Sequence, residues 1–418
     1  MKLLLLETFY SNFEIELAKS ISNDIEALVF NIGNILYLNG ASKIIVHKKI
    51  LKSDFSQRDI IIAKTTRTLY TETLRKIDNI EPSIEDIEYM AKYISFLRTF
   101  LINKKVEMIL MHNDLRWQHS LAIKVCKELN VKYLITESGL FRPDTITIDF
   151  QGVNAYNSLP RDKEYYKDYD INKKELRSYK ISKWINTKVN IKFSLFILLN
   201  KMGDILNINS KLKNKNYSLL KYIKLFIRQQ ISKRNNKNIM SPSKYIFVPL
   251  QVNTDSQILV HSDYKNMQEF ISRVERDFYN LESDIKLIFK IHPMEKGIVE
   301  YKFDNRSITT DRDTNELIEN SECVVTINST VGLEAIKRYK KVLVLGNAFF
   351  KIDGISLSSS KETFKDDIKS ALDGKVGVDN EAIDKFVQYL KYEYQINSDL
   401  FNWDIQALNL VKEKLKIY

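Results

Sequence analysis

The clearest structural signal in the chain is Lys286-Leu287-Ile288-Phe289-Lys290-Ile291-His292-Pro293-Met294-Glu295-Lys296-Gly297, a short apolar run that ends abruptly in polar residues. A second such run is Val324-Val325-Thr326-Ile327-Asn328-Ser329-Thr330-Val331-Gly332-Leu333, which passes directly into a helical pattern. Each run is typical of a buried β-strand followed by a polar loop. Ligands of open α/β sheets bind at the carboxyl ends of the strands, so we expect the chemistry of the chain at these two exits.

Strand and helix patterns alternate on both sides of this region. One series contains strand patterns at 2–6, 106–111 and 132–136, and a second contains them at 244–252, 286–291, 323–328 and 341–346. Such alternation predicts an α/β fold with two Rossmann-like domains facing across a cleft. We expect an N-terminal domain over 1–170, a basic helical connector over 171–242, a C-terminal domain over 243–380 and C-terminal helices over 381–418.

The composition excludes several classes of protein. The 418 residues suit two domains, and no Gly-x-Gly-x-x-Gly or phosphate-loop lysine motif indicates a dinucleotide dehydrogenase or a P-loop enzyme. Cys126 and Cys323 lie far apart in apolar patterns, so we expect buried free thiols and a reducing cytoplasm. The N-terminal apolar run stops at Glu7, and no apolar stretch reaches the ~20 residues of a spanning helix. We therefore expect neither a signal peptide nor a transmembrane segment.

The positive charge is concentrated in one segment. The chain carries a net charge of +11, but residues 171–240 contain 17 Lys and Arg against two acidic residues, a local balance of +15 that leaves −4 elsewhere. One interpretation is a solvated helical connector with its apolar side packed on a domain. The other is attraction to an anionic membrane surface. Nucleic acid is not expected as a partner, because no zinc-finger spacing or aromatic-interleaved basic strand accompanies the charge.

Three polar residues at the two strand exits are candidates for holding a phosphate. Because it precedes a proline, His292 is restricted to extended backbone at its strand exit, where an imidazole could donate to or protonate a departing phosphate. Ser329 and Thr330 begin a predicted helix and could bind the same group. The structural alternatives are a surface histidine and ordinary N-capping by the two hydroxyl residues. The pairing of the two exits favours the functional interpretation.

Two carboxylates follow strands of the first domain. Asp114 and Glu137 could act as base or nucleophile toward an anomeric carbon. Each could instead be a helix cap or an ion-pair partner, with Arg116, His119 or Arg142 as the cation. No set of His, Cys and carboxylate residues has zinc spacing, and carboxylates are too sparse for a magnesium site, so we expect no metal and no cofactor.

Five motifs occur in one order along residues 105–355. They are Glu137-Ser-Gly-Leu-Phe-Arg142-Pro143-Asp144; Gly152-Val153-Asn154 with Pro160-Arg161-Asp162; Phe247-Val-Pro-Leu-Gln251-Val with Asp255-Ser256-Gln257 and His261-Ser262; His292-Pro293-Met294 with Gly297; and Asn328-Ser329-Thr330-Val331-Gly332-Leu333. Together they resemble the bacterial capsule polysaccharide biosynthesis family of KpsS (LipB). Residues 1–100 and 171–240 carry little that matches this family.

The resemblance implies a two-domain glycosyltransferase of the GT-B type. It implies transfer of Kdo from CMP-β-Kdo, with retention, onto a (lyso)phosphatidylglycerol-type lipid, which starts the poly-Kdo linker of the capsule. It further implies a cytoplasmic, peripheral location on the inner face of the bacterial inner membrane, with other capsule assembly proteins as partners. Carried over by position, the catalytic residues would be Glu137, Asp114 and His292. The substrate-binding residues would be Arg116, Arg142, Asn154, Gln251, Asp255, Gln257, Pro293, Lys296, Asn328, Ser329, Thr330 and Gly332.

Two other functions remain open. Another GT-B transferase, using a CMP-sialic acid or CDP-glycerol donor, would need the same phosphate-binding exits. A non-catalytic export or scaffold subunit could retain the fold. The carboxylates at Asp114 and Glu137 favour an enzyme, because a scaffold has no need of them.

Overall fold

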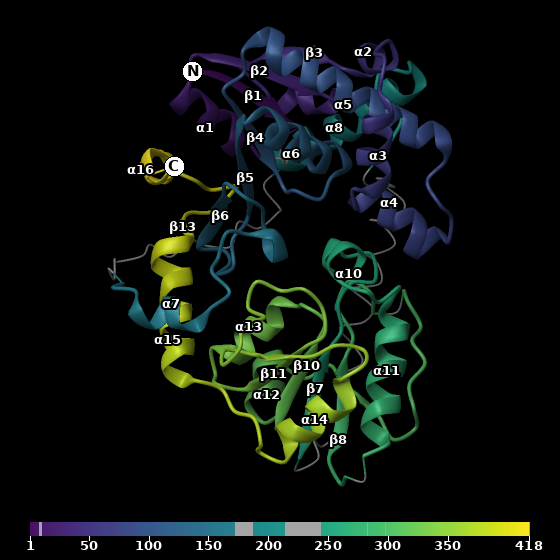
Figure 1. The fold of residues 1–418 in the computed structure, drawn as a ribbon, viewed down its shortest axis with the longest axis vertical. Helices are drawn as coiled ribbons and strands as arrows, with labels where there is room; N and C mark the ends of the chain where they lie inside the picture. The colour runs from purple at the N-terminus through teal and green to yellow at the C-terminus, as the bar shows by residue number, and fades with distance from the viewer. Residues whose placement is uncertain (8–10, 172–186, 214–243, 282, 297, 418) are drawn as a thin grey trace.

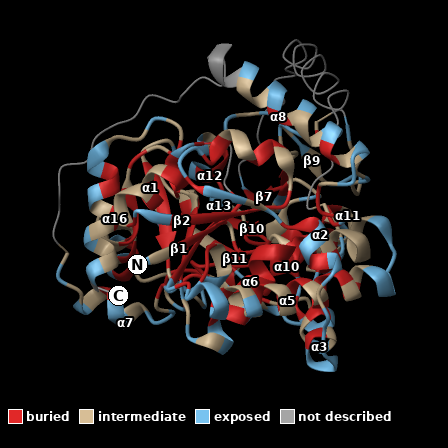
Figure 2. Cartoon of the chain, turned by 90° about the horizontal axis from the view of Figure 1, so that it is seen from above, coloured by how far each residue is buried: buried red, intermediate tan, exposed pale blue. Residues whose placement is uncertain are grey.

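The computed structural model describes residues 1–7, 11–171, 187–213, 244–281, 283–296 and 298–417. Most of the predicted basic connector, including Lys215, Lys221 and Lys224, and also Gly297, lies outside these residues. The described residues form two α/β domains, one above the other in Figure 1. Each domain is built on its own sheet, and the central strands of each sheet are buried (Figure 2).

The N-terminal sheet has seven strands in the order β13-β6-β5-β4-β1-β2-β3. Strands β1 to β5 are parallel, whereas β6 runs antiparallel to β5 and β13 runs antiparallel to β6. Its strands are β1 (Lys2–Leu6), β2 (Asp24–Val29), β3 (Ser42–Ile45), β4 (Met108–His112), β5 (Lys132–Ser138), β6 (Thr145–Asp149) and β13 (Ile396–Asn397).

Helices cover both faces of this sheet because each presents an apolar side to it. The long α5 (Ile84–Lys104) begins with a capping box at Ser83 and buries a stripe that runs from Ile87 to Leu101. The other elements up to residue 205 are α1 (Phe13–Ile21), η1 (Ile32–Tyr37), α2 (His47–Leu51), α3 (Gln57–Thr65), α4 (Leu69–Thr73), η2 (Leu74–Asp78), α6 (Trp117–Leu129), η3 (Asn154–Tyr156), α7 (Lys163–Asp168) and α8 (Thr187–Ile205).

The C-terminal sheet has six parallel strands in the order β12-β11-β10-β7-β8-β9. They are β7 (Tyr245–Pro249), β8 (Lys286–Lys290), β9 (Ile308–Thr309), β10 (Cys323–Thr326), β11 (Lys341–Val344) and β12 (Leu357–Ser358). The helices of this half are α10 (Ser256–His261), α11 (Met267–Tyr279), α12 (Thr314–Glu319), α13 (Thr330–Ile336) and α14 (Phe364–Leu372). The predicted pair of Rossmann-like domains is therefore confirmed, and Cys126 and Cys323 are buried free thiols as predicted.

The end of the chain returns to the first domain. Helix α15 (Asn380–Tyr389), followed by η4 (Leu390–Tyr394), lies beside α7, and β13 then joins the edge of the N-terminal sheet. Helix α16 (Ile405–Ile417) buries Leu408 and Val411 in the same apolar cluster as Leu3 and Leu5 of β1. The predicted C-terminal helices thus exist, but a short strand interrupts them and the last helix belongs structurally to the N-terminal domain.

The loops after the strands of both domains meet at the interface. Leu69 and Leu115 of the N-terminal domain share an apolar cluster with Leu259 and Val260 of α10. On the other side, Phe141, which follows β5, packs on the core of the C-terminal domain. The carboxyl ends of the two sheets therefore face each other, which is the two-lobed arrangement of the GT-B type.

Candidate active site

At the carboxyl end of β4, the buried His112 contacts side chains of β5 and α1. His112 ends β4 beside Thr136 of β5, and its Nδ1 lies 3.1 Å from Thr136 Oγ1 and 3.2 Å from Glu14 Oε1. The Thr136 hydroxyl also donates to Glu14 Oε1 at 3.0 Å. On the far side of the ring, Nε2 lies 3.7 Å from Glu137 Oε1. One imidazole therefore stands between two carboxylates, each drawn from a different element.

Glu137 is held as a carboxylate in this group. Its Oε2 accepts from Asn113 Nδ2 at 2.6 Å and its Oε1 from the Ser138 amide at 2.9 Å, and 18% of its side chain is exposed. Burial acts to raise the pKa of Glu137, but the His112 charge and these hydrogen bonds outweigh it, so the pKa is lowered. An ionised, oriented and partly accessible carboxylate is what a nucleophile at an anomeric carbon requires.

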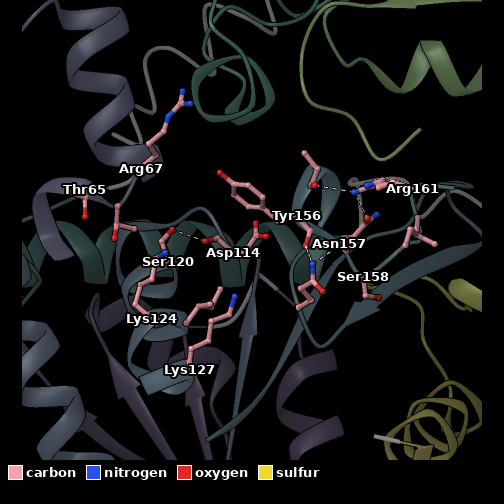
Figure 3. A pocket seen from close by; sticks show the side chains of 15 residues that line it. Thr65, Arg67, Asp114, Ser120, Lys124, Lys127, Tyr156, Asn157, Ser158 and Arg161 are labelled. Atoms are coloured by element: carbon pink, nitrogen blue, oxygen red, sulfur yellow. Dashed lines mark hydrogen bonds between the residues drawn. The ribbon is translucent and has the colours of Figure 1, made fainter. Parts of the chain in front are cut away.

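Asp114, the second predicted carboxylate, makes different contacts. Its side chain is buried, Oδ2 accepts from the Val153 amide at 2.8 Å, and Oδ1 has no hydrogen-bond partner among the described residues. Burial raises the pKa of Asp114 from 3.8 to about 7. Asp114 thus lines a cavity (Figure 3) that Glu137 does not line, whereas Glu137 contacts His112 and Asn113.

Among the described residues, none of the three predicted cationic partners forms an ion pair with Asp114 or Glu137. Arg116 has its Nη1 atom 3.6 Å from Glu7 Oε2, and His119 Nδ1 bonds to the Asn113 carbonyl at 2.9 Å. Arg142 is exposed and donates from Nε to the Gly139 carbonyl at 3.0 Å, while its charge helps to lower the pKa of Glu137. Asn154 begins the short η3 turn with a φ of 54°.

His292 occupies the corresponding exit in the C-terminal domain. It is half-buried, and its Nδ1 lies 3.2 Å from the Met294 amide, which donates to it. In the neutral ring the proton must then be on Nε2, which makes that atom a hydrogen-bond donor. Burial lowers the pKa of His292, although Glu295 and Asp255 oppose this, so the neutral ring is favoured. The neighbouring Pro293 is exposed.

Gln251 and Asn328 form a buried amide pair between β7 and β10. Gln251 Nε2 donates to Asn328 Oδ1 at 3.0 Å, and the backbone N–H of Asn328 donates to Gln251 Oε1 at 3.4 Å. Asn328 Nδ2 in turn donates to the carbonyls of Gln257 and Asn347, at 2.8 and 3.1 Å. Their polar atoms fix the strand exits to one another and to α10, so in this structure both side chains contact protein groups.

The start of α13 combines capping with close packing. The Ser329 hydroxyl accepts from the Val331 amide at 3.2 Å, which is an N-cap, and Thr330 is exposed beside it. A Cβ at Gly332 would lie 2.9 Å from Phe350 Cζ, so the glycine allows the helix to approach that ring. Thr330 is thus exposed and Ser329 half-buried, whereas Gly332 is buried.

The remaining predicted ligands of the donor side have protein partners. Asp255 caps α10 by accepting from the Gln257 amide at 2.9 Å. Lys296 forms an ion pair with Asp311. The described residues contain no group of three or more His, Cys, Asp or Glu side chains arranged to hold a metal ion.

Two residues of this site have no predicted role from the sequence. His112 stands at a strand exit, the same signal that marked His292, and could have been selected on that ground. Glu14 is a carboxylate between buried apolar residues of α1 and is itself 1% exposed, which acids rarely are unless they have a partner such as His112. Glu14 lies three and four positions before the buried Leu17 and Ala18, on the same side of α1, and this spacing is the sequence signal for its burial.

Comparison with known proteins gives a family and several relatives. The sequence model of the capsule polysaccharide biosynthesis protein family matches residues 107–400. The export protein KpsS of Escherichia coli is 28% identical over 317 residues, which cover 70% of this chain and 78% of KpsS. LipB of Neisseria meningitidis serogroup A, a capsule polysaccharide modification protein, is 27% identical over 289 residues, covering 62% of this chain and 68% of LipB.

Among solved structures, the β-Kdo 2,7 transferase KpsC of Thermosulfurimonas dismutans aligns with a TM-score of 0.38 and 14% identity, covering 87% of this chain and 98% of that chain. The family model spans well over half of the chain and contains all five motifs identified in the sequence. The predicted resemblance is therefore confirmed: the chain belongs to the capsule polysaccharide biosynthesis protein family.

Proposed function

We propose that this chain is a retaining β-Kdo glycosyltransferase, which transfers Kdo from CMP-β-Kdo to a (lyso)phosphatidylglycerol-type lipid and so initiates the poly-Kdo linker. The observation that carries the proposal is the pair of opposed exits. An ionised Glu137, oriented by Asn113 and His112, stands at the carboxyl end of one sheet. His292, whose Nε2 can donate a hydrogen bond, stands at the carboxyl end of the other sheet.

The proposed reaction has two displacements at the anomeric carbon. A Glu137 oxygen forms a bond to that carbon while the bond to the CMP phosphate breaks, and the electron pair leaves with CMP. The acceptor hydroxyl then displaces the carboxylate, releases its proton to the medium and regenerates Glu137. Two inversions give net retention. His292 Nε2 would donate to the departing phosphate, with Ser329 and Thr330 beside it.

The group around His112 would position the nucleophile. His112 lies between Glu14 and Glu137, 3.2 Å from Glu14 Oε1 and 3.7 Å from Glu137 Oε1, so it bridges the two side chains in a buried setting. This arrangement keeps Glu137 ionised although burial opposes ionisation. Glu14 and His112 are therefore positioning residues in the proposal.

A nucleotide-release assay identifies which nucleotide-linked substrate the protein uses as its donor. Purified protein is supplied with CMP-β-Kdo, CMP-sialic acid or CDP-glycerol together with lysophosphatidylglycerol, and release of CMP or CDP is followed. Release from CMP-β-Kdo supports the proposal, and release only from another donor supports the alternative GT-B transferase. No release from any donor would support the non-catalytic export subunit, a role consistent with the name of the relative KpsS.

Replacing Glu137 tests the nucleophile. Glu137→Gln keeps the size and loses the charge, so turnover should fall at least about a thousandfold. A Kdo ester trapped on Glu137 by mass spectrometry would support the covalent step. Full turnover in Glu137→Gln would refute the role assigned to this residue.

The surface of α8 supports an anionic membrane as the partner. Its residues Ile191, Leu195, Leu198, Met202 and Ile205 recur every three or four positions, so they share one helix face, and they are 42% to 84% exposed. The opposite side packs on η1, where a Cβ at Gly33 would lie 2.5 Å from the Phe196 carbonyl. None of the described helices is both long and apolar enough to cross a bilayer. We propose that the exposed stripe inserts into the surface of an anionic bilayer.

Two lysines of the basic segment already have acidic partners in the structure, so they are less available to an anionic membrane. Within the described part of the basic segment, Lys211 pairs with Glu85 at 2.7 Å and Lys213 pairs with Asp204. In the proposal the apolar stripe of α8 makes the membrane contact. Leu198→Gln with Ile205→Gln should therefore weaken binding to phosphatidylglycerol vesicles at least tenfold in a flotation assay. The matched control is Ile80→Gln with Ile102→Gln, two other exposed isoleucines. Equal binding of both double variants would remove the stripe from the membrane contact.

A further inference from the structure

Glu295 is an acid in the turn that follows β8, three residues after His292. Only 5% of it is exposed. Acids are almost never buried to this extent unless their charge is paired or hydrogen-bonded. Its burial at a strand exit therefore indicates that this carboxylate has specific partners.

Both carboxylate oxygens of Glu295 accept a hydrogen bond. Oε1 accepts from the backbone N–H of Asn253 at 2.5 Å, and Oε2 accepts from the Tyr301 hydroxyl at 2.5 Å. Burial raises the pKa of Tyr301, and the Glu295 carboxylate raises it further, so the hydroxyl keeps the proton that it donates. Because Asn253 belongs to the loop after β7, one carboxylate joins the exits of two neighbouring strands.

The backbone of Glu295 belongs to the same turn as His292. The N–H groups of Glu295 and Lys296 donate to the His292 carbonyl, at 2.9 and 3.2 Å. On the other side of the contact, Asn253 Oδ1 accepts from the backbone N–H of Met267 at the start of α11, at 2.8 Å. The turn that carries the imidazole and the loop after β7 are thereby fixed to each other by one side chain.

The charge of Glu295 also acts on His292. Burial lowers the pKa of His292, and the carboxylates of Glu295 and Asp255 oppose this decrease. Asp255 lies in the loop that Glu295 holds in place. Glu295 therefore supplies one of the two negative charges and fixes the loop that carries the other.

We propose that Glu295 is a positioning residue, which locks the loop after β7 to the His292 turn and places a fixed negative charge near the imidazole. Its part in transfer rests on the proposed function, in which His292 Nε2 donates to the departing phosphate. The contacts themselves require no substrate, so they can be tested in the absence of any donor.

Glu295→Gln tests the charge. The amide oxygen can still accept from Asn253 and the amide nitrogen can donate to Tyr301, so the fold is retained, and folding is checked by circular dichroism. The pKa of His292 is measured by NMR on a chain with isotope-labelled histidine, in which the His292 signal is the one lost in His292→Gln. Glu295→Gln should lower this pKa by about 0.5 or more, because a nearby negative charge is removed. A pKa that is unchanged, or that rises toward 6.5 as it would on exposure to solvent, would refute the role of the charge.

The matched control is Glu300→Gln, which removes the same charge from an exposed side chain of the same segment. It should leave the pKa of His292 as in wild type. An equal decrease in both variants would mean that the net charge of the segment sets this pKa, and it would overturn the assignment to Glu295.

Glu295→Asp tests the position, since it keeps the charge and shortens the side chain by one methylene group. The Asn253 N–H then loses its acceptor, so hydrogen exchange in peptides spanning 251–257 should become at least about tenfold faster. The control Glu300→Asp should exchange as wild type. A wild-type rate in Glu295→Asp, or the same acceleration in the control, would refute the lock between the two exits.

Both measurements use the chain without substrate, so they separate this inference from the proposed function. If no donor releases its nucleotide but both variants respond as expected, the proposed function fails and the contacts assigned to Glu295 stand. If CMP is released from CMP-β-Kdo but neither the pKa of His292 nor the exchange rate responds, the proposed function stands and the positioning role of Glu295 is overturned.

Discussion

Replacing Asp114 by asparagine should stabilise the folded chain at pH 8 relative to wild type, more than it does at pH 4. Burial raises the pKa of this carboxyl from 3.8 to about 7 in the folded protein. Between these two values the folded state binds a proton that the unfolded state has lost. Wild-type stability therefore falls as the pH rises from about 4 to about 7, and a neutral amide at the same place removes this dependence.

The size of the effect follows from the shift. About three pH units, at about 1.36 kcal/mol per unit, correspond to about 4 kcal/mol between pH 4 and pH 8. The group is 3% exposed, so solvent screening reduces this value little. The unpaired amide nitrogen of the variant adds a cost of its own. Because that cost is the same at both pH values, it cancels from the comparison.

The measurement is urea unfolding of wild type and Asp114→Asn at pH 4 and pH 8. Tryptophan fluorescence suits it, since Trp117 is buried in the core of the same domain. The control is Asp54→Asn, which makes the same substitution at an exposed aspartate that does not line the cavity. A gap between Asp114→Asn and wild type that is the same at both pH values, or larger at pH 4, would contradict the reasoning.

Three further predictions concern packing and positioning. Gly332→Ala should destabilise the C-terminal domain by about 1–3 kcal/mol, because its Cβ would meet the Phe350 ring at 2.9 Å; calorimetric unfolding measures this. Gln251→Leu should cost about 1–3 kcal/mol in the same experiment, since it leaves Asn328 Oδ1 without its buried donor. Glu14→Gln should lower kcat about tenfold with little change in KM, because it replaces the carboxyl group that contacts His112 on the side of the ring opposite Glu137. Unchanged values in any of these assays would contradict the corresponding contact.

The local features of the site could be predicted from the sequence. Each follows from a pattern of a few residues: an apolar run that stops at His292, a hydroxyl residue before a helix at Ser329, and an acid after a strand at Glu137. The pairing of these exits across two domains follows from the alternation of strands and helices. The order of the five motifs was sufficient to identify the family, which the match over residues 107–400 confirms.

The partners of each polar group could not be predicted in the same way. Glu14 and His112 are separated by 98 residues, and Gln251 and Asn328 by 77, so their contacts depend on which strands lie side by side. A carboxamide at a strand exit has the same local signal whether it binds a ligand or another amide. Only the packed structure distinguishes the two cases.

By itself, the sequence determined the class of fold, the two domains, the chemical character of the strand exits and the family. These properties depend on local periodicity and residue type, which a linear pattern records. The tertiary structure alone decided that the chain end returns to the first sheet through β13, a strand of two residues without periodicity. It also separated Asp114, in its own cavity, from Glu137, in the His112 group. Both outcomes depend on which distant groups burial brings together, and no local pattern specifies that.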